Sequence, residues 1–498
     1  MLREFWKFFR PRPKQRIEEQ ASPVGEGTPR REWVNERIQR RVSHARIQVG
    51  LDFGTSATKA TYRVLGVENP QVRPILFEHQ SANYPRYCLP SLGSFTEDGQ
   101  LVLGIEADAH LAGRPWGEGL TRFKMLVAGA QDSRYLDEKL RNRYDAYVRK
   151  TIGSEDGCSP EALAATYLAY AMRLIRGALE REVRASSVDI SFNTCVPIDQ
   201  RENNRVFAGF QRVVATAERL EKSQDREDKP GRKWLEVAAE LLSVTKYDET
   251  DANTRLFLVP EAVASVAAYL VSLRKRAGIH ALYDIGAGTT DLSIFNLDVS
   301  RTRGTTNFWY AARSIPMGTG QIEERVAELR RDTDTDTNPG DIIAALSTPG
   351  GINREELNAV RDGLATIWDR TSKGWSQAFK YHLRKSSEWS ADKVQVFLAG
   401  GGASLSGASA TFRECPLMQR WGPYPCSLLP APDGYDSRNG VAPFARMSVA
   451  YGLSIPIPEL EVNLMPSESP DHTPPPPPPS GRYTPSSDDE MIPKPGWI

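Results

Sequence analysis

The sequence predicts an α/β protein, because short apolar segments of strand length alternate with longer amphipathic segments of helical periodicity. With 498 residues, the chain is long enough for about three units of roughly 150 residues or for one large two-lobed protein. A hydrophobic content of 40% allows it to bury a sizeable core.

The predicted elements follow in chain order. An apolar run at 46–54 ends in a glycine turn, and a returning strand follows at 57–65. A serine and a proline at 159–160 begin an apolar-periodic stretch, which predicts a long capped helix. The polar stretch 221–234 is expected to be a surface insertion. Further buried strands are predicted where apolar runs end at glycine or proline, at 188–197, 256–260, 281–286 and 394–402.

Composition argues against several classes of protein. Lys plus Arg and Asp plus Glu both number 63, and this zero net charge argues against a general nucleic-acid binder. No apolar run is long enough for a transmembrane helix, and the N-terminus does not resemble a secretory signal. The five cysteines are scattered without a Cys-x-x-Cys pair, which indicates reduced thiols in a cytoplasmic protein and no zinc site.

Two similar glycine turns are the main candidates for a binding site. Asp52-Phe-Gly-Thr-Ser-Ala-Thr58 is echoed by Asp284-Ile-Gly-Ala-Gly-Thr-Thr-Asp291, 284 − 52 = 232 residues further along. Each lies between two strands, so each predicts a β-hairpin whose turn amides donate hydrogen bonds to phosphate oxygens. An aspartate at the turn entrance cannot face phosphate without a cation between them, so Asp52 and Asp284 suit hydrated Mg²⁺. One copy is typical of an ordinary hairpin, but two predict a clamp on one phosphate chain.

A third predicted strand ends in Gly400-Gly401-Gly402. Glycines at this position permit a flat base or ribose to lie against the backbone. A plain strand-to-helix turn is the alternative interpretation.

The order of these motifs resembles the actin-like ATPase superfamily, and within it the DnaK-type heat-shock 70 kDa chaperones. The resemblance covers roughly residues 46–455. The stretches 89–110 and 190–204, together with Lys124, favour the chaperone branch. The matching segments are a first phosphate hairpin, a connecting helix, a second phosphate hairpin, an adenosine turn and a second connecting helix, at 49–56, 260–270, 283–293, 397–405 and 444–454.

The resemblance implies a two-lobed actin-like ATPase fold of duplicated ribonuclease-H-like domains, with ATP or ADP and Mg²⁺ in the cleft between the lobes. The first lobe would span 47–259 and the second 260–443. Residues 444–455 would form a helix that returns to the first lobe.

The resemblance also implies residue roles. Asp52 and Asp284 would hold Mg²⁺ through water. Lys124 would lie beside the γ-phosphate, Glu261 would bond a metal-bound or attacking water, and Asp291 would orient that water; Thr289 also belongs to this catalytic group. The cofactor-binding residues would be Gly54, Thr55, Ser56, Gly286, Gly288, Thr289, Thr290, Gly318, Gly400, Gly401 and Gly402. The alternatives are an ordinary surface lysine for Lys124 and a helix N-terminal charge for Glu261.

The sequence departs from the family pattern in three places. Ser404 stands where the family carries an adenine-stacking arginine, and 320–385 holds no convincing copy of its Lys/Arg/Glu adenine clasp. After residue 455 we expect a proline-rich tail in place of the chaperones' peptide-binding domain. Adenine preference is therefore open.

The two ends suggest partner contacts. Residues 1–46 hold 12 Lys/Arg against six Glu, and Leu2, Phe5, Trp6 and Phe9 follow helical spacing. This basic N-terminal arm is either disordered or a short amphipathic helix that docks on a protein partner or, more weakly, on a membrane surface. Residues 456–498 hold 13 of the 35 prolines, which predicts a disordered spacer or a ligand for a partner's groove.

The expected function is that of a stand-alone chaperone-like ATPase that hydrolyses ATP slowly. Its lobes would close on the nucleotide, and a protein partner would recognise this conformational change. An actin-like filament or scaffold, a small-molecule kinase or phosphatase of the same superfamily, and a pseudo-ATPase that only binds nucleotide are the alternatives.

Overall fold

The chain is a mixed α/β protein in the computed structural model. Residues 1–43 of the basic N-terminal arm and residues 465–498 of the proline-rich tail, with the predictions made for them, lie outside the described residues. The tail was predicted to be disordered from residue 456, but Asn463–Leu464 forms a short strand, so the prediction is wrong there. The structure describes residues 44–79, 81, 83–114, 118–153, 158–183, 185–196, 204–223, 231–244, 255–300, 304–332, 346, 351–382, 388–413, 422–456, 459 and 463–464.

The first sheet carries the first predicted hairpin. Its strands are β1 (Ala45–Asp52), β2 (Ala57–Val64), β3 (Arg73–Pro74), β4 (Leu89–Pro90), β8 (Val188–Val196) and β9 (Leu256–Pro260). Their order is β3-β2-β1-β8-β9, with β4 also paired to β2. β1 is antiparallel to β2 and parallel to β8, and β8 is parallel to β9.

The second sheet repeats this arrangement. Its strands are β10 (Gly278–Ile285), β11 (Thr290–Ser300), β12 (Gly304–Ile315), β13 (Gln395–Ala399), β14 (Cys426–Leu428) and β15 (Asn463–Leu464). β10 is antiparallel to β11 and parallel to β13, and β13 is parallel to β14. The order β14-β13-β10-β11-β12 therefore matches the first sheet, and hairpin β10–β11 takes the place of hairpin β1–β2.

Helices cover the first sheet and bury a large apolar core against it. α6 begins as predicted, because the Ser159 hydroxyl accepts a hydrogen bond from the Ala162 amide and a proline follows at the first helical position. The predicted surface insertion at 221–234 is wrong at its end, because Trp234 is only 1% exposed. The elements are α3 (Gly104–Leu111), α4 (Phe123–Gln131), α5 (Glu138–Ile152), α6 (Pro160–Glu182), α7 (Asn204–Ser223) and α8 (Arg232–Val244), with the small sheet β5 (Leu92–Phe95), β6 (Leu101–Leu103) and β7 (Leu120–Thr121).

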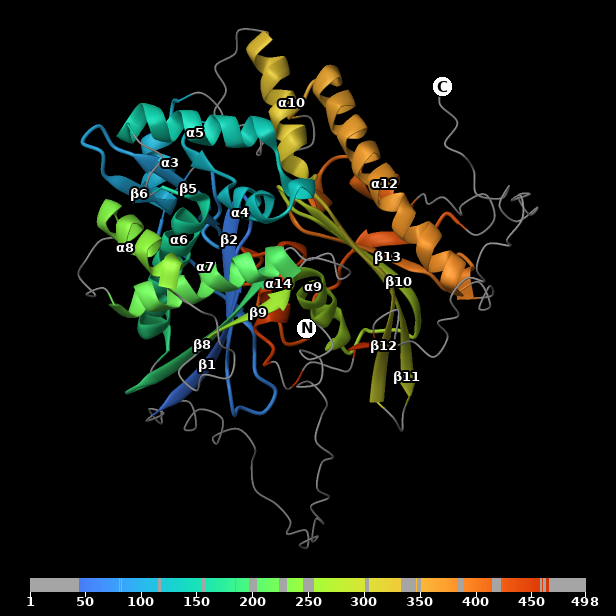
Figure 1. Ribbon diagram of the computed structural model, residues 1–498. Coiled ribbons are helices and arrows are strands. Elements are labelled where there is room, and N and C mark those ends of the chain that lie inside the picture. The colour runs from blue at the N-terminus through green and yellow to red at the C-terminus, as the bar shows by residue number, and fades with distance from the viewer. Residues whose placement is uncertain are drawn as a thin grey trace, which may run out of the picture.

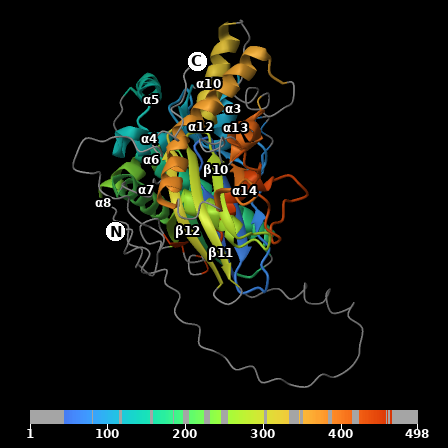
Figure 2. The same ribbon diagram turned by 90° about the vertical axis from the view of Figure 1, so that its right-hand side faces the viewer.

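The second sheet has its own core. Helices α10 (Thr319–Asp332) and α12 (Arg354–His382) lie side by side, as Figures 1 and 2 show, and α12 packs on β12 and β11. A short 3₁₀ turn at Gly401–Ser404 and helix α13 (Ala408–Arg413) follow β13.

Two helices join the sheets at the centre of the molecule (Figure 1). α9 (Glu261–Leu270) follows the last strand of the first sheet, and α14 (Phe444–Leu453) comes after the corresponding strand of the second. The two helices pack against each other, and α14 also packs on β1 and β2. No helix in the described ranges is both long enough and apolar enough to cross a bilayer.

A buried histidine makes the stability of the second sheet sensitive to acid. His280, on β10, is 2% exposed; its Nδ1 donates to the Gly278 carbonyl and its Nε2 accepts from the Tyr269 hydroxyl. Burial lowers the pKa of His280 from 6.5 to about 4, although the Gly278 carbonyl acts in the opposite direction. The folded state therefore needs the neutral imidazole.

We expect this histidine to stabilise the fold fully above pH 6.5 and to lose that contribution as the pH falls toward 4. The free energy of unfolding should drop by about 3 kcal/mol over this interval, since each pH unit costs about 1.4 kcal/mol per proton. Denaturant unfolding at several pH values checks this. In His280→Phe, the slope of the free energy of unfolding against pH should correspond to about one proton fewer taken up on unfolding. An unchanged slope would contradict the assignment.

Candidate functional site

A cleft between the two sheets brings most of the predicted site residues together. Its empty space, including the mouth that opens to solvent, is about 1010 Å³. Of the 16 predicted residues, those that line the cleft are Asp52, Gly54, Thr55, Ser56, Lys124, Glu261, Asp284, Gly286, Thr289, Gly400 and Gly401.

Each hairpin places its first aspartate at the last or second-last residue of a buried strand. In the first hairpin Asp52 pairs across the strands with Lys59, and in the second Asp284 pairs with Asp291. The Gly54 amide donates to the Asp52 carbonyl at 3.0 Å, and the Gly286 amide donates to the Thr289 carbonyl at 2.9 Å. These bonds close two tight turns that point into the cleft.

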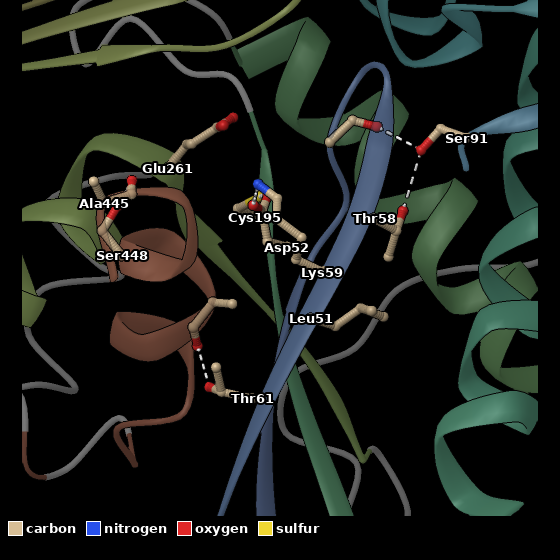
Figure 3. A network of polar contacts seen from close by, with 12 residues as sticks. Leu51, Asp52, Thr58, Lys59, Thr61, Ser91, Cys195, Glu261, Ala445 and Ser448 are labelled. Carbon is tan, nitrogen blue, oxygen red and sulfur yellow. Dashed lines mark hydrogen bonds and ion pairs between the residues drawn. The ribbon is translucent and has the colours of Figure 1, made fainter. Parts of the chain in front are cut away.

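Neighbouring segments hold both turns in place. The Ser91 hydroxyl donates to the Gly54 carbonyl at 2.8 Å, and Thr61 donates to the Ala450 carbonyl of α14 at 2.9 Å (Figure 3). On the other side, the Thr319 amide at the start of α10 donates to the Gly286 carbonyl at 2.9 Å.

The two turns approach each other closely. A Cβ on Gly288, in the second hairpin, would lie 2.7 Å from Oγ1 of Thr55, in the first. Only glycine leaves room for this approach. A single ligand in the cleft can therefore touch both turns.

Five predicted residues lie just behind the cleft wall. Thr290 donates to the Met317 carbonyl, and the Gly318 amide donates to the Gln321 side chain, so both support the second turn from outside. Gly402 packs on Ile285, and Gly288 separates the turns. Asp291 is buried beside Asp284 on the neighbouring strand.

An ion pair neutralises Asp52. Its Oδ2 lies 2.5 Å from Nζ of Lys59, and Cys195 Sγ donates to its Oδ1 at 3.6 Å (Figure 3). Burial is the largest single effect and lowers the pKa of Lys59, but the neighbouring acidic groups, Asp52 first among them, together raise it above its usual value. Lys59 is therefore a fixed cation at the first turn.

A second ion pair joins two predicted catalytic residues. Nζ of Lys124 lies 2.9 Å from Oε2 of Glu261, and the Lys124 side chain is only 3% exposed, so it is not a surface lysine. Burial would lower the pKa of Lys124, yet the Glu261 carboxylate raises it above its usual range. Glu261 is the first residue of α9 and is 13% exposed, so it combines a favourable helix-terminal position with a cleft contact.

The second hairpin holds buried carboxylates that are short of partners. Oδ2 of Asp284 and Oδ1 of Asp291 make no hydrogen bond, although both side chains are at most 5% exposed. Burial, followed by the charge of Glu261, raises the pKa of Asp284 to about 7 and that of Asp291 well above its usual range. Such orphaned acids favour binding of a cation.

The donor set fits Mg²⁺. Four carboxylates line the cleft against three cations; the acids are Asp52, Glu261, Asp284 and Glu323, and the cations are Lys59, Lys124 and Arg446. Mg²⁺ prefers oxygen ligands and keeps much of its water, which suits the orphaned Asp284 oxygen.

A thiol also lies in this cluster. Ligand atoms of Asp52, Cys195 and Glu261 lie within 4.8 Å of one another, a spacing that one ion can bridge. Burial raises the pKa of the Cys195 thiol well above its usual range, so the sulfur is protonated and acts as a hydrogen-bond donor.

The turn after β13 differs from the pattern of the family that the sequence resembles. Ser404 is exposed, does not line the cleft and donates to the Gly401 carbonyl. From the described part of 320–385, Glu323 and Leu346 reach the cleft. Tyr84 and Arg446 also line the cleft.

Sequence reasoning missed several cleft residues, among them Lys59, Tyr84 and Arg446. For Lys59 a signal existed, since a lysine in a strand directly opposite an aspartate predicts a cross-strand ion pair. Cys195 was counted only as a scattered thiol. No local pattern marks Arg446, because it reaches the cleft through the packing of α14.

The chain matches no model of a known protein family. A search of curated proteins likewise found no significant relative.

Proposed function

We propose that this protein binds ATP with Mg²⁺ between the two sheets, as an actin-like ATPase of two ribonuclease-H-like lobes, and hydrolyses it slowly. The observation that carries the proposal is the pair of topologically equivalent hairpins that meet in one cleft, each with an aspartate at its entrance. A triphosphate is long enough to touch both turns, so it would hold the two lobes together.

The repeated strand order supports the fold assignment. β1 and β10 are central in their sheets; β1 is antiparallel to β2 and parallel to β8, and β10 is antiparallel to β11 and parallel to β13, as in duplicated domains. α9 and α14 follow equivalent last strands and cross between the sheets. The cleft therefore lies at the junction of two related units.

The roles of the residues follow from charge and position. Bound Mg²⁺ would supply positive charge to the phosphate oxygens, held through water by Asp52 and Asp284. The turn amides would donate hydrogen bonds to phosphate oxygens held in the concave face of each turn. Lys124 would stabilise charge at the terminal phosphate, and Glu261 would accept a hydrogen bond from the attacking water.

Slow turnover is consistent with the Lys124–Glu261 ion pair. The Glu261 carboxylate is already bonded to Nζ of Lys124 at 2.9 Å, which weakens it as an acceptor for a water proton. Nucleotide binding must share or break this bond.

Contacts across the cleft supply a basis for a conformational switch. Nη2 of Arg122, next to α4, donates to the Gly320 carbonyl of α10 at 2.9 Å, and Arg143 of α5 pairs with Glu324 of α10 at 3.0 Å. After loss of the terminal phosphate, only such contacts would hold the lobes together, so the lobes could change their relative orientation. A protein partner would recognise this change.

The test is titration calorimetry with ATP, ADP and GTP in Mg²⁺ and in EDTA, together with a phosphate-release assay. We expect Mg²⁺-dependent binding and slow release of phosphate. Nucleotide-dependent sedimentation of the protein would favour the filament alternative over a switch. If the protein binds none of the three nucleotides, the proposal is overturned.

A further inference from the structure

Arg446 is the cleft cation without a carboxylate partner. Lys59 pairs with Asp52 and Lys124 pairs with Glu261, whereas Arg446 has no carboxylate within ion-pair distance among the described residues. It is half-buried in the cleft wall. From this we infer that Arg446 binds the α-phosphate of the nucleotide, an assignment that rests on the proposed function.

Its position in α14 is unfavourable for the fold alone. Arg446 is the third residue of the helix, at the end where the helix dipole disfavours a positive charge. The preceding Pro443 provides no side-chain cap. The partial positive charge of the helix N-terminus and the charge of the guanidinium therefore lie close together, and both favour binding of an anion.

Local packing fixes the guanidinium at the cleft wall. It lies over the Tyr87 ring, 5.7 Å from the ring centroid. Its Nη2 lies 4.0 Å from the place where a Cβ on Gly401 would stand, so it borders the glycine turn after β13. The Gly400 amide donates to the Ala445 carbonyl at 2.8 Å, which ties this turn to the helix.

Arg446 and the predicted catalytic pair border different parts of the cleft wall. Lys124 pairs with Glu261 at the start of α9, whereas Arg446 borders the Gly401 turn after β13. A nucleotide with its terminal phosphate at Lys124 would place its first phosphate and its ribose toward Gly401 and Arg446.

A guanidinium suits this role because it carries several donors in a planar fork and stays charged at every working pH. ATP and ADP share the α-phosphate, and adenosine lacks it. Recognition by Arg446 should therefore be equal for the two nucleotides and absent for the nucleoside.

The experiment compares wild type, Arg446→Ala and Arg446→Lys by calorimetry with Mg-ATP, Mg-ADP and adenosine. Arg446→Ala should weaken the binding of ATP and of ADP by the same factor, about 10- to 100-fold, and leave the affinity for adenosine unchanged. Arg446→Lys should lose less affinity for the two nucleotides. The matched control is Arg86→Ala, an exposed arginine beside Tyr87 that does not line the cleft. It should bind like wild type.

Two results would overturn the inference: unchanged ADP affinity in Arg446→Ala, or an equal loss for adenosine, which would indicate packing or base stacking. Thermal unfolding of each variant verifies that the fold is intact, and Arg446→Lys provides the test if the alanine variant unfolds. If wild type binds nucleotide and Arg446→Ala binds it equally well, only this inference fails. If wild type binds none, the proposed function fails with it.

Discussion

Replacing Lys124 with methionine is expected to reduce ATP turnover by about 10²- to 10³-fold, the usual cost of losing one preorganised charge at a transition state. The Lys124 ammonium is buried and fixed by Glu261 at 2.9 Å, so it needs no reorganisation when charge develops on the phosphate. Methionine keeps the unbranched shape and removes the charge. Single-turnover phosphate release measures the effect, and Mg-ADP affinity should change far less.

Lys150→Met is the matched control, because Lys150 is exposed on α5. It should turn over ATP at the wild-type rate. Equal turnover by wild type and Lys124→Met, with both proteins folded, would remove Lys124 from the catalytic group.

Replacing Gly452 with alanine is expected to destabilise the protein by about 3 kcal/mol, at the upper end of the cost of overpacking. A Cβ there would lie 2.6 Å from the Ala264 carbonyl carbon and closer still to its oxygen. The obstacle is backbone, so α9 and α14 must move apart. Denaturant unfolding measures the loss, and Mg-ADP affinity should fall as well because Glu261 begins α9.

Gly177→Ala, in the middle of α6, provides the contrast. The nearest atom to its added Cβ is the flexible end of Arg181 at 3.4 Å, so the change should be neutral or stabilise the protein by up to about 1 kcal/mol. A Gly452→Ala protein as stable as Gly177→Ala would refute the close helix crossing.

Strong local patterns predicted much of the fold. The α/β class is confirmed, and the strands ending at Asp52, Val196, Pro260, Ile285 and Ala399 appear where apolar runs meet glycine or proline. Ser159 and Pro160 begin α6 because their chemistry satisfies the first helical turn locally. Such signals need no knowledge of distant residues.

Features that depend on long-range packing were not predictable in this way. Trp234 follows a polar stretch yet is buried, since α8 packs on α6. Cys195 meets Asp52 only because β8 lies parallel to β1. The cleft residues from α14 depend on a helix crossing more than 390 residues after the first hairpin, since 446 − 52 = 394. The assignment to two actin-like lobes stays a prediction.

The most direct test of the proposed site asks whether Asp52 and Asp284 act on one ion. Mg²⁺-dependent ADP affinity should be measured by calorimetry in wild type, Asp52→Asn, Asp284→Asn and the double variant. We expect each single change to abolish most of the gain in affinity from Mg²⁺, and the double variant to lose little more, because the two carboxylates share that ion. Additive losses, or Mg²⁺ dependence that survives either change, would contradict a single metal-bound nucleotide held between the two hairpins.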